Sequence, residues 1–137
     1  MAEAVVIEAA ALLDLLLGNP EGEAVGAALA GREVHLADPV GVVVAGALGR
    51  LAAEGTLSAG QLGSRIRLLE SAPFTTHSAL TLIGGAVQRG ELSLGDALSV
   101  ELSDQLDAPL LTTEVRLAAV WPRSWLVTSP VRDQPGR

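Results

Sequence analysis

The fold is decided at the start of the chain by the stretch AVVIEAAALLDLLLG, residues 4–18. Its first four residues are apolar and rich in β-branched side chains, which is typical of a buried strand. The run after Glu8 is longer and poor in β-branching, so it predicts a helix, and Gly18 is the kind of residue that ends one. The stretch therefore predicts a strand followed directly by a helix, with an acid at the junction.

Strand and helix signals alternate along the rest of the chain. Further strands are predicted at residues 33–36, 108–113 and 125–129, with a short extended piece at 73–76. Helices are predicted at 20–30, 38–54, from 58 onward, and at 77–89, 93–106 and 115–120. This alternation predicts a three-layer α/β/α domain with a mostly parallel sheet of four to five strands. We expect one domain over residues 1–130 and a flexible polar tail over 131–137.

The composition excludes several classes of function. The chain has 137 residues and a net charge of −7, and all nine of its basic residues are arginine, so no broad nucleic-acid-binding surface is expected. The absence of cysteine excludes disulfides, thiolate catalysis and cysteine-based zinc sites. No charge-free stretch approaches the roughly twenty residues of a membrane-spanning helix, and no signal peptide is recognised, so a cytoplasmic protein without membrane contact is expected.

Three acids occupy positions where chemistry is expected in a parallel sheet. Glu8 and Glu114 each follow a predicted strand, and Asp96 lies early in a predicted helix. Carboxylates that converge at one sheet edge repel one another unless a cation lies among them, and Mg²⁺ or Mn²⁺ is the usual one. Such an ion supports hydrolysis of a phosphodiester. The alternative is that each acid only caps or compensates the positive end of a helix.

Two motifs give the chain a resemblance to a known family. VVIEAAALLDLLLG (residues 5–18) and GDALSVELSDQLDAPLLTTEVRLA (residues 95–118) resemble a PIN domain, and among these the VapC-type toxins of bacterial toxin–antitoxin pairs. The resemblance covers residues 4 to 129, with its specific motifs at the two ends. It implies a metal-dependent RNA endonuclease that forms a homodimer and has a cognate antitoxin.

The family holds its metal with four acids, and this chain departs from that pattern. The resemblance carries the metal-binding and catalytic roles onto Glu8, Asp96 and Glu114, two of which are Glu where the family has Asp. Alignment of ALGRL, residues 47–51, places the family's helix Glu on Val43. Mg²⁺ tolerates misplaced ligands poorly, so we expect binding of Mg²⁺ or Mn²⁺ to be weak or absent. The acids nearest to replacing the lost one are Asp38 and Glu101.

Three hypotheses follow from these residues. The chain is a VapC-like RNA endonuclease by ancestry with weakened or lost activity, a nuclease-dead module that acts through dimer and antitoxin contacts, or an unrelated α/β domain whose acids are helix caps. The two histidines lie far apart in sequence. We expect His35 to be a strand-end or core residue and His77 to begin a helix.

Overall fold

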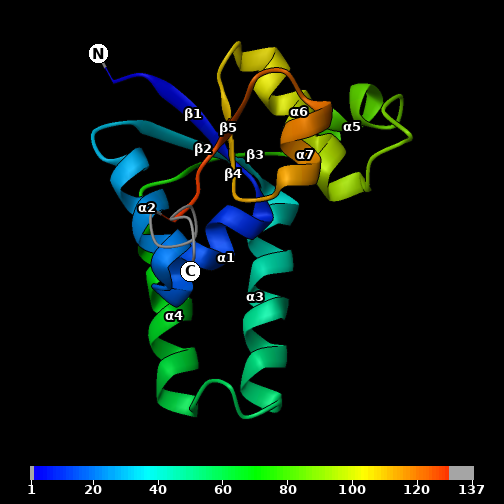
Figure 1. Ribbon diagram of the computed structural model, residues 1–137. Helices are drawn as coiled ribbons and strands as arrows, with labels where there is room; N and C mark the ends of the chain where they lie inside the picture. The colour runs from blue at the N-terminus through cyan, green and yellow to red at the C-terminus, as the bar shows by residue number, and fades with distance from the viewer. Residues whose placement is uncertain (1, 130–137) are drawn as a thin grey trace.

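A single parallel sheet organises the chain, as Figure 1 shows for the computed structural model, which describes residues 2–129. Its strands lie in the order β3-β2-β1-β4-β5, and every neighbouring pair is parallel. The strands are β1 (Ala4–Ile7), β2 (Glu33–Ala37), β3 (Thr75–His77), β4 (Leu110–Thr112) and β5 (Ser124–Leu126). The prediction of a parallel sheet of four to five strands is confirmed.

Helices cover the sheet and connect its strands. In Figure 1, α5, α6 and α7 gather on one side, while α3 and α4 run beside each other as the two arms of a long hairpin. The helices are α1 (Ala9–Leu17), α2 (Pro20–Leu29), α3 (Asp38–Ala53), α4 (Ala59–Ser71), α5 (Ala79–Ala86), α6 (Leu94–Leu106) and α7 (Val115–Val120). The parallel strands require such crossover connections, and the central strands β2, β1 and β4 are buried on both faces as a result.

The first strand lies at the centre of the core. Val5, Val6 and Ile7 are completely inaccessible to solvent, and Leu110 and Leu111 of the neighbouring β4 are equally buried. Since β1 is central, its carboxyl end, and that of β4 beside it, open onto the middle of one sheet edge. The residues that follow these two strands, Glu8 and Thr113–Glu114, are therefore neighbours in space although they are far apart in the chain.

The junction of α1 and α2 follows the predicted signals. Gly18 takes a left-handed conformation with φ of 68° and ends α1, and the Asn19 side chain accepts a hydrogen bond of 2.7 Å from the Gly22 N–H. A Cβ atom at Gly22 would lie 1.9 Å from the backbone oxygen of Asp14. Only glycine permits this close approach of α2 to the end of α1.

The structure corrects the prediction between α4 and α6. His77 does not begin a helix; it is the last residue of β3 and lies opposite Ala37 in the parallel register. Helix α5 starts only at Ala79, because the Ser78 side chain caps it by accepting a hydrogen bond of 3.3 Å from the Leu80 N–H. The short extended piece predicted at residues 73–76 is therefore present as β3, but it lies at Thr75–His77 and includes the residue that was predicted to begin the helix.

Smaller differences lie at other element ends. Asp38 is the first residue of α3 and makes no capping hydrogen bond, since the N-cap position is Ala37. The last strand is Ser124–Leu126 and not 125–129. The predicted tail at 131–137 lies outside the described residues. No helix in residues 2–129 combines the length and the apolar character that a membrane span requires.

Candidate functional site at the carboxyl edge of the sheet

Glu8 is a buried carboxylate that caps the first helix. Its side chain is 1% exposed, and its two oxygens accept hydrogen bonds of 2.9 Å from the Ala10 N–H and 2.8 Å from the Ala11 N–H. Burial raises the pKa of Glu8 above its ordinary value of 4.5, and the charge of Glu114 acts in the same direction, whereas the hydrogen bonds lower it. For Glu8, the helix-capping interpretation of the sequence is confirmed.

Thr112 connects this carboxylate to Glu114. Its hydroxyl donates a hydrogen bond of 3.0 Å to Oε1 of Glu8 and accepts one of 2.9 Å from the Glu114 N–H. Thr112 is fully buried at the end of β4. The hydroxyl of Thr112 therefore helps to orient the Glu8 carboxylate, and it also fixes the backbone of Glu114.

The next residue makes a second link to α1. The Thr113 hydroxyl donates a hydrogen bond of 2.8 Å to Oδ2 of Asp14, whose other oxygen accepts a bond of 2.9 Å from the Asn19 amide. Both threonines before Glu114 are thus tied to acids of the first helix or its cap. These two bonds hold the end of β4, and with it the start of α7, against the first helix.

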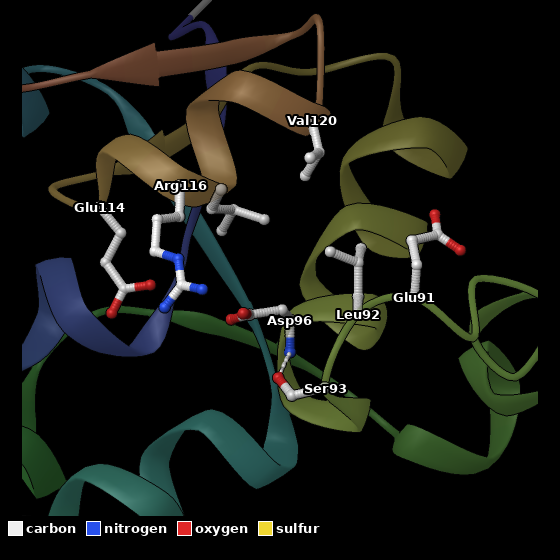
Figure 2. Close-up of a pocket in the computed structure, with 8 residues that line it drawn as sticks. Glu91, Leu92, Ser93, Asp96, Glu114, Arg116 and Val120 are labelled. Carbon is white, nitrogen blue, oxygen red and sulfur yellow. Dashed lines mark hydrogen bonds between the residues drawn. The ribbon is translucent and has the colours of Figure 1, made fainter.

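Asp96 and Glu114 line one pocket of about 310 Å³, between the start of α6 and α7. Figure 2 shows both carboxylates directed into it, with the guanidinium of Arg116 in the space between them. The Asp96 backbone is fixed by its N–H, which donates a hydrogen bond of 3.2 Å to Oγ of Ser93. Leu92, Leu117 and Val120 give the same pocket an apolar wall.

The three predicted acids therefore have two kinds of surroundings. Glu8 is a buried helix cap, whereas Asp96 and Glu114 face the same pocket. Among residues 2–129, no group of three or more histidine or acidic side chains is placed so that it could hold a metal ion. The oxygens of Glu8 face three hydrogen-bond donors, and the positive charge of Arg116 lies between the other two acids. The residues present do not form a ready site for Mg²⁺ or Mn²⁺.

The positions considered for a fourth acid have other surroundings. Val43 on α3 is 52% exposed and presents an apolar side chain. Glu101 is paired with Arg89 at 3.2 Å and packs over Gly85, so it is engaged within the α5–α6 layer. Asp38 lines a different pocket, between α3 and α4.

Sequence reasoning identified the acids but missed the residues that position them. The signal for Thr112 and Thr113 was their place directly before Glu114, where a hydroxyl can reach the neighbouring strand's end. The signal for Arg116 was its position two residues after Glu114, within the first turn of α7. Neither signal shows from sequence alone which acid each side chain meets.

Comparison with known proteins identifies a relative that matches most of the chain. No family model matches it. It is 38% identical over 122 residues to Ribonuclease VapC3 of Mycobacterium tuberculosis, in both the CDC 1551 / Oshkosh and H37Rv strains, covering 88% of this chain and 89% of that protein.

Two solved structures share the fold. A crystal structure of a protein from Pyrobaculum aerophilum matches with a TM-score of 0.66 at 18% identity, covering 93% of this chain and 92% of that one. A toxin–antitoxin complex from Klebsiella pneumoniae matches with a TM-score of 0.64 at 18% identity, covering 91% of this chain and 97% of that one. These two structures support the α/β/α fold. The sequence similarity to Ribonuclease VapC3 shows the family to which the chain belongs.

The hypothesis of an unrelated α/β domain is therefore wrong, although its account of Glu8 as a helix cap is correct. The match covers 88% of this chain, which agrees with the resemblance carried by the two end motifs. The chain belongs to the VapC family of PIN-domain toxins.

Proposed function

We propose that this chain is by ancestry a Mg²⁺- or Mn²⁺-dependent RNA endonuclease whose activity is weakened or lost. The observation that carries the proposal is the engagement of Glu8 with Ala10, Ala11 and Thr112, together with an apolar residue at position 43. A divalent ion would have to compete with three hydrogen-bond donors for Glu8. At position 43 of α3 it would find a valine in place of a carboxylate.

The acids that we propose as the remnant of the ancestral metal site are Glu8, Asp96 and Glu114. Support comes from Thr112, which links Glu8 to the backbone of Glu114, and from the pocket that Asp96 and Glu114 share. The exposed Arg116 guanidinium lowers the negative charge of that pocket, and so lowers its attraction for a cation. RNA remains the proposed substrate because the similar M. tuberculosis protein is a ribonuclease.

The test is a calorimetric titration with Mn²⁺, followed by RNA cleavage assays at the same ion concentration. We compare the wild type with Asp96→Asn and with Glu91→Gln, a pocket acid that points away from Arg116 in Figure 2. Weak, saturable binding that Asp96→Asn abolishes and Glu91→Gln spares supports a surviving but weakened site. Tight binding with vigorous cleavage by the wild type contradicts the proposal.

A second candidate function is a nuclease-dead module that acts through protein contacts. It is favoured by large apolar side chains that lie open on two helices: Val42 and Val43 of α3 are 74% and 52% exposed, and Leu80 of α5 is 84% exposed. Contiguous exposed apolar surface marks contact sites, and Val42 and Val43 are consecutive residues of α3. We propose a homodimer and a cognate antitoxin as the partners, since a structural neighbour is a toxin–antitoxin complex.

Co-expression with the proteins encoded on either side of this gene tests the second candidate. A stable complex and a dimer measured by light scattering support it. A chain that stays monomeric and fails to bind either neighbour contradicts it, whatever the result of the metal titration.

A further inference from the structure

The two histidines, distant in sequence, form a hydrogen-bonded pair across neighbouring strands. Nδ1 of His35, on β2, lies 2.8 Å from Nε2 of His77, at the end of β3. The other ring nitrogen of His35, Nε2, lies 2.5 Å from Oε1 of Glu33. His35 is only 7% exposed, while His77 is half-buried on the edge strand.

The relative placement of the two rings is that of an N–H···N hydrogen bond. The ring centroids are 5.1 Å apart, which equals the 2.8 Å between the nitrogens plus one ring radius at each end. The two nitrogens and two centroids therefore lie nearly on one line. A metal ion bound by both nitrogens would need their lone pairs to meet at a point off that line, so the geometry favours an N–H···N hydrogen bond over a metal site.

The number of protons on the pair decides whether this bond exists. Because Glu33 can only accept when ionised, Nε2 of His35 carries a proton, and the remaining bond joins Nδ1 of His35 to Nε2 of His77. One proton on that bond satisfies both nitrogens, in the neutral pair and in the singly charged pair. When both rings are fully protonated, two N–H groups face each other and the bond is lost.

The surrounding charges act on the two rings differently. Burial and the charge of His35 lower the pKa of His77, and Asp38 opposes them. Glu33 faces His35. Helix α6 also packs on β2, but its acids have other surroundings: Glu101 and Asp104 pair with Arg89, and Asp96 lines the pocket described above.

We propose that Glu33, His35 and His77 form an acid-sensitive latch that holds edge strand β3 to β2. The latch is closed while at least one imidazole of the pair is neutral, and it opens when both become charged. The side-chain contact of the latch adds to the backbone hydrogen bonds between β2 and β3, which are few because β3 is only three residues long. The inference is independent of the metal site and of ribonuclease activity.

The sign of the pH effect follows from His77. Its pKa in the folded protein lies below the ordinary value of 6.5, so the unfolded or locally opened chain binds more protons in this range. The latch therefore stabilises the β2–β3 contact above pH 6.5 and loses this effect as the pH falls through 6.5 towards the lower folded pKa.

Amide hydrogen exchange measured by mass spectrometry tests the latch. Between about pH 7.5 and 5.5, after correction for intrinsic rates, we expect β3 protection to fall about tenfold more in the wild type than in His77→Gln. Glutamine can donate from Nε2 to His35 but does not titrate. The peptide covering β4 is the internal control. An equal change in both proteins, or in β3 and β4 alike, overturns the proposal.

A second measurement uses the unaltered protein, so that it does not depend on the folding of a variant. Proton NMR follows the two imidazoles through the same pH range. We expect the His77 imidazole to titrate below the ordinary histidine pKa of 6.5, because burial and the charge of His35 lower its pKa. A His77 titration at or above 6.5 would overturn the proposal.

Discussion

The hydroxyl of Thr112 donates a hydrogen bond of 3.0 Å to Oε1 of Glu8, which joins the carboxyl end of β4 to that of β1. Both side chains are buried. The same hydroxyl accepts from the Glu114 N–H, so the geometry of two candidate site acids depends on one oxygen atom. Two of the predictions below concern this connection directly.

Replacement of Thr112 by valine should destabilise the protein. Valine has nearly the same shape but removes the hydroxyl, which leaves a buried oxygen of Glu8 and the Glu114 N–H with one partner fewer. We expect the free energy of unfolding to fall by about 1–3 kcal/mol, measured by urea denaturation. Thr112→Ser keeps the hydroxyl and is the matched control; a loss as large as that of valine would contradict this role for the bond.

The raised pKa of Glu8 predicts a dependence of stability on pH. The folded state holds a proton on Glu8 more tightly than the unfolded state does, so the contribution of Glu8 to stability is greatest below pH 4.5 and declines as the pH rises through its folded pKa. Relative to Glu8→Gln, which does not titrate, the wild type should lose stability over that interval. Chemical denaturation at a series of pH values measures the difference, and a constant difference would show that the pKa of Glu8 is not raised.

Glu101 should prove structural and not a replacement ligand. Its side chain is 12% exposed and pairs with Arg89, which also lies over the Trp121 ring at 5.2 Å. Glu101→Gln should lower the free energy of unfolding by about 1–3 kcal/mol, because it removes one partner of a partly buried pair. Binding of Mn²⁺ should not change.

Asp104 offers a matched control for that variant. It pairs with the same Arg89, but its side chain is 57% exposed. Asp104→Asn should therefore cost only about 0–1 kcal/mol. If Glu101→Gln abolishes Mn²⁺ binding while the protein stays folded, Glu101 acts at the metal and the account of its role is wrong.

The sequence was most informative where local chemistry and burial agree. Residues 4–18 combine β-branching, an acid and a glycine in an order that predicts a strand followed directly by a helix, and the structure has both elements at the predicted bounds. It was least informative at His77, because the three-residue β3 is held by pairing with β2 and with His35, both distant in the chain. Short edge strands depend on such partners and leave little local pattern.

The candidate site was predictable in its acids and not in their surroundings. The positions of Glu8 and Glu114 after two strands follow from the topology of a parallel sheet. That Glu8 turns back to cap α1, while Arg116 enters the pocket of Asp96 and Glu114, depends on side-chain directions that no spacing fixes. The same limit applies to Glu101, whose partner Arg89 lies twelve residues earlier.

The central claim is that an apolar residue at position 43 leaves the acidic site short of a ligand. Calorimetric titration of Val43→Glu with Mn²⁺, beside the wild type and Val43→Glu/Asp96→Asn, tests it most directly. The account predicts that Val43→Glu binds Mn²⁺ at least about tenfold more tightly than the wild type, equivalent to about 1.4 kcal/mol, and that Asp96→Asn removes the gain. Binding by Val43→Glu that cannot be distinguished from that of the wild type would contradict it.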